Sequence, residues 1–485
     1  MARGLSGITL VVLLLAPMGA ARGQSQNPPL GQAALPAGFD LPRLESEALL
    51  WLQSLIRFDT VDPPGNDIAA AKYLAGILQK EGINAQIFQS APNRGFLVAR
   101  LSATALPDPS RALLLVGHLD TAGVDRAKWT VDPFGGVTEN SYLYGRGAIE
   151  GKAMTVANMA ALIALKRSNA HLDRDVIFFA DGDEQSDGDH GMKFAVDKYW
   201  DQIAAGFAIN EGGHVVMKGG KVQYVGVQVD EKVSRNLDVI ATPAAAAGHG
   251  SLPGQDNPIT HLAAAIEKIA AYQTPVQFNF VTRDYFDGLA SIEDEETGKW
   301  LRALEEPDRE AHAVEWLSNA NPVWGEMMRD TIAPTMLQAG VRPSEVPAEA
   351  RGVVNLRILP GNLVEPLVAK LQQAVNDPQV HLEVEPDGAP PAPASSTDSP
   401  LYNTIAQAAK QQFPGTAVLP YMSANSTDSA FLRERSVQTY GLLPFALTQD
   451  DLLRAQAGDE RIQLDTFRKG FEFLYQIVSD FAVSK

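Results

Sequence analysis

A histidine and an aspartate lie two residues apart, directly after an apolar run of the sequence. The run ALLLV at 112–116 leads through Gly117 to His118 and Asp120. In an extended segment residues i and i+2 face the same side, so these two side chains project together. The second ring nitrogen of a metal-bound histidine is normally held by a carboxylate or a carbonyl. The pair is therefore suited to a metal site in which Asp120 orients His118.

Carboxylates follow two further apolar runs and one glycine-rich turn. Glu184 follows the run 175–180, Glu211 follows 206–210, and Glu150 lies in the turn GRGAIEGK. If the runs are parallel strands, their carboxyl ends meet at the edge of the sheet where such folds bind ligands. A buried cluster of carboxylates and imidazole suits a divalent metal such as zinc.

The spacing of apolar residues predicts the elements that would position these groups. Between 43 and 227 segments of helical period alternate with short apolar runs, which is typical of βαβ units and predicts an α/β fold with a mostly parallel, doubly wound sheet. The predicted helices cover 43–57, 66–81, 151–167 and 191–203, and the predicted strands cover 112–116, 175–180 and 206–210.

The pattern changes after residue 227 and changes back near residue 356. A strand at 233–242, helical stretches at 258–273 and 292–318, and a strand at 351–359 predict an inserted α+β domain. We predict five parts: a signal peptide at 1–23, a linker at 24–42, a catalytic domain at 43–227 and 356–485, and the inserted domain at 228–355.

The N-terminus has the pattern of a secretory signal. Arg3 precedes the apolar run ITLVVLLLA at 8–16, and small residues suited to cleavage follow near residue 21. The run is too short to span a membrane, and no later stretch is long and apolar enough. We therefore expect an exported protein, and the absence of cysteine favours a bacterial periplasm or secretion.

The composition limits the chemistry that the chain can perform. Among 485 residues there are 40 Lys and Arg against 58 Asp and Glu, no Cys and eight His. The net charge of −18 argues against a nucleic acid partner, which requires clustered basic residues. Without Cys there are no disulfides, thiolate nucleophiles or thiolate metal sites, so a metal must bind to His, Asp, Glu or neutral oxygen donors.

The order and spacing of these motifs carry a family resemblance. From FDTVDPPG at 58–65 to the C-terminal helix, the chain resembles the dinuclear-zinc exopeptidases, a family that includes aminoacylase, carboxypeptidase G and succinyl-diaminopimelate desuccinylase. The resemblance implies an α/β zinc-binding catalytic domain and a smaller dimerisation or lid domain. It also implies a homodimer that acts on peptides or N-acyl amino acids.

The resemblance assigns roles to the residues after each strand. It implies that His118 binds the first metal ion and is oriented by Asp120, and that Glu211 is the carboxylate ligand of the same ion. Glu150 stands where the family has a bridging Asp. Glu184 matches the general base of the reaction.

The second metal site departs from the family pattern. Gln185 stands where that ion expects a Glu, and Gln456, in RAQAGDER, stands where it expects a His. No shifted histidine can replace it, because the last histidine of the sequence is His381. Amide oxygens are weak, uncharged donors for zinc. We therefore expect one tightly bound zinc ion and a second site that is weak or empty.

The resemblance also extends into the inserted domain. His249, in GHGSLP, matches a histidine that reaches across the dimer to stabilise the oxyanion, and Arg357 matches the arginine that binds the substrate carboxylate. Ser344 replaces an Asn that the family often uses nearby. His190 and His214 flank the predicted site, either as replacement ligands or as ordinary loop residues.

The sequence thus predicts an exported metallohydrolase of amide bonds, with Glu184 as base and Arg357 as carboxylate clamp. Two alternatives stay open. The chain could be a non-catalytic homologue that binds peptide-like ligands in the same cleft. It could also perform metal-free chemistry on this scaffold, such as a lyase reaction that uses Glu184 and His249.

Overall fold

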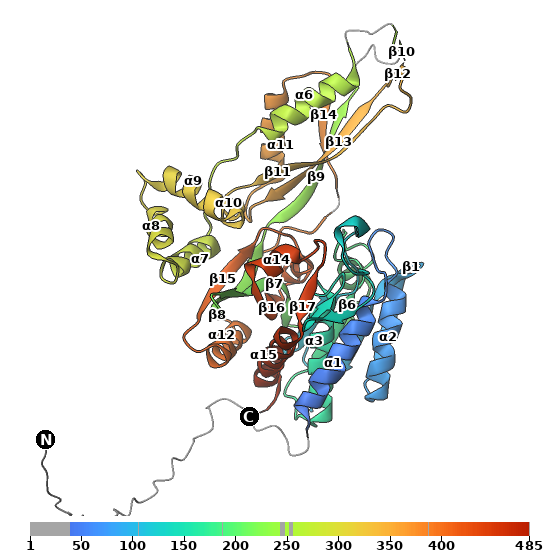
Figure 1. Cartoon of the computed structure of the whole chain (residues 1–485), viewed down its shortest axis with the longest axis vertical. Coiled ribbons are helices and arrows are strands. Elements are labelled where there is room, and N and C mark those ends of the chain that lie inside the picture. The colour runs from blue at the N-terminus through green and yellow to red at the C-terminus, as the bar shows by residue number, and fades with distance from the viewer. Residues whose placement is uncertain are drawn as a thin grey trace, which may run out of the picture. The chain divides into compact units, whose positions relative to one another are not determined.

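The computed structural model describes residues 39–104, 106–186, 188–242, 248–251, 256–386 and 388–484 (Figure 1). The predicted signal peptide at 1–23 and most of the predicted linker at 24–42 lie outside the described residues. Helix α1 (Leu41–Ile56) begins after Asp40, whose side chain accepts a hydrogen bond from the backbone N–H of Arg43 at 3.0 Å. The last two residues of the predicted linker therefore belong to a helix.

Helices and strands alternate along the described chain. The helices after α1 are α2 (Asp67–Lys80), α3 (Lys152–Arg167), α4 (Met192–Lys198), α5 (Trp200–Ile203), α6 (Pro258–Ala270), α7 (Phe280–Ala290), α8 (Glu295–Ala303), α9 (Glu310–Ala320), α10 (Pro322–Met327), α11 (Val364–Val375), α12 (Pro400–Gln412), α13 (Ser429–Glu434), α14 (Gln449–Arg454) and α15 (Leu464–Ala482). The strands are β1 (Ala85–Ala91), β2 (Arg94–Leu101), β3 (Leu113–His118), β4 (Val137–Glu139), β5 (Tyr142–Tyr144), β6 (Val176–Asp181), β7 (Phe207–Lys218), β8 (Lys221–Glu231), β9 (Val233–Ala241), β10 (Gly248–His249), β11 (Thr331–Ala339), β12 (Glu345–Val346), β13 (Ala350–Ile358), β14 (Val380–Val384), β15 (Ala417–Ser423), β16 (Gln438–Thr448) and β17 (Arg461–Gln463). Within the described ranges no helix combines the length and the apolar character that crossing a membrane would need.

The central sheet has eight strands in the order β1-β2-β6-β3-β7-β16-β8-β15. Its middle strands β6, β3, β7 and β16 run parallel, which confirms the predicted α/β fold with a mostly parallel sheet. Side chains of β3 alternate between two cores: Leu113 and Leu115 join one, and Leu114 and Val116 join the other. The sheet is therefore buried on both faces.

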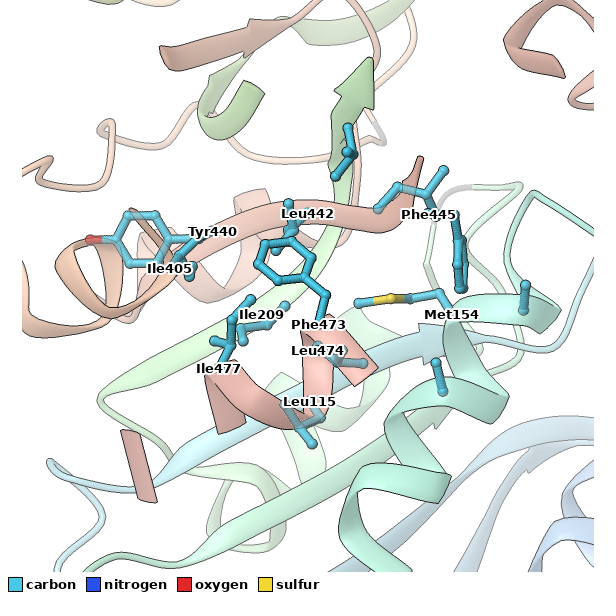
Figure 2. Packing of buried hydrophobic residues seen from close by; sticks show 14 of the residues in the cluster. Leu115, Met154, Ile209, Ile405, Tyr440, Leu442, Phe445, Phe473, Leu474 and Ile477 are labelled. Atoms are coloured by element: carbon cyan, nitrogen blue, oxygen red, sulfur yellow. The ribbon is translucent and has the colours of Figure 1, made fainter. Parts of the chain in front are cut away.

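Helices cover each face of this sheet. On one face α15 packs against α3 and β16, with Phe473 of α15 in the same core as Leu115, Ile209 and Met154 (Figure 2). On the other face α4 and α13 pack over the second core, which contains Met192. The helix layers fix the strands, so the strand ends that carry the site residues have fixed positions.

Strand β7 differs from the predicted strand at 206–210. It continues past Glu211 to Lys218, where Gly219 and Gly220, both at positive φ, turn the chain into antiparallel β8. Glu211 therefore lies within a strand rather than after one. Gly212, at φ +111°, interrupts the regular alternation directly after Glu211.

The inserted domain is built on a second sheet with the order β11-β13-β9-β14. Helices α6 and α11 contribute to its core (Figure 1). The predicted boundary at 355 falls inside β13, and β14, which lies beyond that boundary, pairs with β9. This sheet therefore extends from 233 to 384.

Helices α7 to α10, which interrupt the second sheet in sequence, pack against the catalytic part instead. Tyr285 of α7 contacts Tyr421 of β15 with ring centroids 5.4 Å apart. Tyr285 and Met327 belong to the same core as the central sheet. Of these helices, α7 and α10 border the cleft, through Tyr285 and through Val323 and Trp324.

A buried arginine connects the segments that lead to the site. Arg94 of β2 pairs with Asp62 at 2.9 Å, with Asp67 at 3.2 Å, and with Asp183. Burial raises the pKa values of Asp67 and Asp183 to about 8, and the Arg94 guanidinium acts against this shift in both. The pairing fixes Asp183, and therefore the residue after it, Glu184.

We predict that replacing Arg94 with Met destabilises the protein by about 3 to 5 kcal/mol, because it leaves buried carboxylates without a partner. The measurement is the free energy of unfolding in urea. The control is Arg126→Met, since Arg126 and Asp132 form a pair in which both side chains are more than half exposed, and it should cost less than about 1 kcal/mol. Equal effects of the two variants would contradict the prediction.

Candidate metal centre and active-site cleft

His118, the last residue of β3, is buried and held on one side of its ring. Its Nδ1 lies 3.0 Å from the carbonyl oxygen and 3.2 Å from Oδ1 of Asp120. Both atoms are acceptors, so Nδ1 carries the proton and donates it. The opposite nitrogen, Nε2, is buried, has no hydrogen-bond partner and lies 3.3 Å from Oε2 of Glu211. A buried, unpartnered imidazole nitrogen beside a carboxylate fits a metal ligand.

A glycine makes room for this ring. Gly151 precedes helix α3 at φ +135°, and a Cβ placed there would lie 2.0 Å from Nε2 of His118. The Cβ of any other residue would therefore collide with the imidazole ring. Gly151 belongs to the glycine-rich turn GRGAIEGK, which was predicted to present Glu150 at the start of a helix.

Three carboxylate and imidazole groups come together at this edge of the sheet. One ligand atom from each of His118, Glu184 and Glu211 lies within 4.8 Å of the others. Glu150, predicted as a ligand, lies outside that group. Its backbone N–H donates to Oε1 of Glu460 at 3.1 Å. The structure thus brings together two of the three predicted ligands and the predicted base.

The cluster carries negative charge that is poorly compensated by protein groups. Burial, followed by the Glu211 carboxylate, raises the pKa of Glu184 well above its usual range and raises the pKa of Glu150 to about 8. Although burial opposes it, Glu211 and Asp120 raise the pKa of His118. The site therefore favours a positive charge, which a divalent ion supplies better than a proton does.

An ion pair that the sequence analysis missed holds the Glu150 turn. Arg146 pairs with Glu460 at 2.7 Å, and both side chains are almost fully buried. Glu460 also accepts hydrogen bonds from the backbone N–H groups of Ile149 and Glu150. Arg146 also donates a hydrogen bond to the backbone oxygen of Gln456, at 2.9 Å. This pair connects the turn to the C-terminal segment.

The two glutamines at the implied second metal site lie next to each other, although they are far apart in sequence. Gln456 Nε2 donates to Gln185 Oε1 at 3.0 Å, and Gln185 Nε2 donates to Glu184 Oε2 at 2.7 Å. The resemblance predicted this proximity, since both positions would hold one ion. The structure shows the two amides bonded to each other and to the predicted base.

The carboxylates of the cluster face a cleft of about 940 Å³. Glu184 and Glu211 line it on the side of the central sheet, and Arg357 and Asn355 line it on the side of the second sheet. Arg357 Nε donates to Asn355 Oδ1 at 2.9 Å, which fixes the guanidinium. Burial lowers the pKa of Arg357 and Glu184 acts to raise it. A substrate carboxylate at Arg357 would thus lie in the same cleft as the metal ligands.

The other predicted histidines are not part of the cluster. His249 lies on the exposed strand β10, and it is absent from the described residues that line the cleft. His190 donates its backbone N–H to Asp183, and His214 contacts the ring of Tyr421 with centroids 5.3 Å apart. Burial lowers the pKa of His214 to about 4, so its ring is neutral. Ser344 contributes its backbone oxygen to the loop after His249.

A cluster of histidine and carboxylates at the edge of a mostly parallel α/β sheet, open to a cleft, fits a divalent metal ion that activates water for hydrolysis. The family model described as "Peptidase family M20/M25/M40" matches residues 114–480. The chain therefore belongs to this family of metal-dependent peptidases and amidohydrolases, whose metal is typically zinc.

Curated relatives and solved structures agree with this assignment. The chain is 26% identical over 399 residues to "Probable carboxypeptidase S-like 2" of Dictyostelium discoideum, covering 77% of this chain and 72% of the relative. It is 26% identical over 381 residues to human "N-fatty-acyl-amino acid synthase/hydrolase PM20D1", covering 77% and 75%. The fold matches the M20 metallo-carboxypeptidase Sso-CP2 from Sulfolobus solfataricus with a TM-score of 0.67 at 19% identity, over 90% of this chain and 99% of that one.

We predict that zinc stabilises the metal-stripped protein through His118 and Glu211. An ion that binds only the folded state raises its stability by about 4 kcal/mol when the ion concentration is 1,000 times its dissociation constant. The measurement is the melting temperature after chelation and after zinc is returned. Glu211→Gln should abolish most of the zinc-dependent rise, whereas Glu139→Gln, which changes an exposed carboxylate of β4, should preserve it. An equal rise in Glu211→Gln would show that zinc binds elsewhere.

Proposed function

We propose that the chain is an exported hydrolase that cleaves the amide bond of N-acyl amino acids or short peptides, with one tightly bound zinc ion. The observation that carries the proposal is the shared cleft, in which Glu184 and Glu211 face the same space as Arg357. A base, a metal ligand and a group that fits a carboxylate are the elements that cleavage next to a free carboxylate needs.

The residues of the chain divide the work of this reaction. His118 and Glu211 would hold zinc, with Glu150 as a further oxygen donor, and bound zinc lowers the pKa of water and polarises the amide carbonyl. Glu184 accepts the proton of the attacking water and delivers it to the nitrogen of the leaving amine. Asp120 keeps the His118 ring in the tautomer that leaves Nε2 free. Arg357 binds the substrate carboxylate in a bidentate manner.

The proposed oxyanion donor comes from a second copy of the chain. Nδ1 of His249 accepts from the backbone N–H of Ser251 at 3.2 Å, so in the neutral ring Nε2 carries the proton and points it outward as a donor. The edge strand β11 supports pairing of two copies, because Met336 and Leu337 on it are 63% and 66% exposed. A homodimer would bring His249 of each subunit towards the cleft of the other.

The wall of the cleft favours a substrate with an apolar acyl group. Val323 of α10 and Leu453 of α14 line the cleft, and their side chains are 42% and 69% exposed. Trp324 and Tyr421 line the same space. Relatives named as N-fatty-acyl-amino acid hydrolases support the same substrate class.

Export is proposed from the charged and apolar pattern of residues 1–23, outside the described part of the chain. The bacterial periplasm fits a chain without cysteine. The N-terminal residue of the mature protein, determined by mass spectrometry after expression in a bacterium, tests the cleavage expected near residue 21.

We predict that the chain hydrolyses N-acyl amino acids, and that Glu184→Gln lowers kcat by about 10² to 10⁴ fold with zinc content unchanged, because the amide keeps the shape but cannot accept the proton. The measurement is turnover of a panel of N-acyl amino acids and dipeptides, with chelator and with added zinc. Absence of turnover in every metal condition would contradict the proposal. Turnover that resists chelation would contradict the role of the metal.

We predict that the double substitution Val323→Asn and Leu453→Asn lowers kcat/KM for long-chain acyl substrates about tenfold and leaves the acetyl substrate unchanged. The reason is the loss of apolar contact, for which each methylene contributes about 1 kcal/mol or more. Leu50→Asn is the control, since Leu50 is 61% exposed on α1 and absent from the cleft lining. An equal loss for both substrates would show that the wall has no role in acyl selection.

A further inference from the structure

We propose that Gln185 and Gln456 form a neutral hydrogen-bonded bridge that takes the place of a second metal ion and holds the general base Glu184 in position. The inference rests on the proposed function, because it takes Glu184 as the base and one zinc ion as the cofactor. It assigns the two glutamines as positioning residues of this chain, not as remnants of a lost site.

The donors and acceptors of the bridge have a defined direction. An ionised Glu184 can only accept, so the atom of Gln185 that lies 2.7 Å from it must be the NH₂ group. The oxygen of Gln185 then faces Gln456, whose NH₂ group donates to it at 3.0 Å. The two amides therefore align head to tail and end on one carboxylate oxygen of the base.

Both ends of the bridge are anchored to elements of the metal centre. The backbone N–H of Gln185 donates to Oδ2 of Asp120 at 2.8 Å, and Asp120 also holds His118. Gln456 is held through its backbone oxygen by Arg146, at 2.9 Å. Its φ of +60° is costly for a residue other than glycine, and such strain persists where surrounding contacts enforce it. The bridge thus connects three segments: the turn that carries Arg146 and Glu150, the segment of Gln185 and the segment of Gln456. A second ion bound by these positions would cross-link the same three segments.

The charge of the site explains why amides suit this position. One carboxylate oxygen of Glu184 lies within 4.8 Å of one of Glu211, so the base already has a negatively charged neighbour. A glutamate at 185 would add another negative charge beside the base, which only a second cation could offset. Glutamine supplies a hydrogen-bond donor to the base without that charge. The two amides are therefore consistent with a single ion.

The test measures kcat, KM and zinc content in Gln185→Met, Gln456→Leu and the double variant. Gln185→Met removes a hydrogen bond to a charged group and should lower kcat about tenfold, with KM within twofold and one zinc retained. Gln456→Leu should lower kcat several-fold. The double variant should lose no more than Gln185→Met, because residues that act as one unit are not additive. The control is Gln476→Met, which breaks a surface amide pair with Gln411.

The outcomes separate this inference from the proposed function. Unchanged kcat in Gln185→Met, with one zinc per wild-type chain, would overturn the bridge and leave the proposed function intact. Two tightly bound zinc ions in the wild type would overturn both the bridge and the single-ion proposal.

A second measurement does not depend on activity. The pair of substitutions Gln185→Glu and Gln456→His supplies a carboxylate and an imidazole at the two adjacent positions. We expect this variant to bind two zinc ions per chain, while each single substitution binds one. A zinc content that stays at one in the pair would contradict the placement of the two side chains around a second metal position.

Discussion

The structure depends on one constraint, which is the burial of several carboxylates beside a single imidazole at the edge of a parallel sheet. Glu184 and Glu211 lie within 4.8 Å of a ligand atom of His118, and burial raises the pKa of Glu184. The carboxylates of such a cluster stay ionised only when a cation binds them or when neutral groups donate hydrogen bonds to them. The proposed zinc ion and the proposed amide bridge are two responses to this constraint.

The fold converts distant sequence segments into this one site. β3 and β6 end side by side, with His118 opposite Asp181. β3 and β7 pair as far as Leu115 and Ile209, and Glu211 follows two residues later in β7. The second sheet then supplies Arg357 across the cleft, and helices α10 and α14 supply its apolar wall. In the proposed function, recognition of a carboxylate, chemistry at an amide and selection of an acyl group are thus carried by three different parts of the chain.

Much of this arrangement could be predicted from the sequence, because period and motif spacing are local signals. The buried strand ending at His118 and the βαβ alternation led to the mostly parallel sheet, which the structure confirms. The proximity of Gln185 and Gln456 followed from the family resemblance alone. Three features were not predictable in this way. The extension of β7 depends on its pairing with β8, the extent of the second sheet depends on β14 pairing with β9, and the Arg146–Glu460 pair joins residues 314 positions apart.

We propose that the chain uses one zinc ion where its family resemblance implies two. A crystal structure of the zinc-loaded protein, with anomalous scattering data collected at the zinc edge, would count the ions. We expect a single anomalous peak beside Nε2 of His118 and Glu211, with the amides of Gln185 and Gln456 bonded to each other. Two peaks about 3.5 to 4 Å apart, as in two-metal hydrolases, with the second beside these amides, would contradict it.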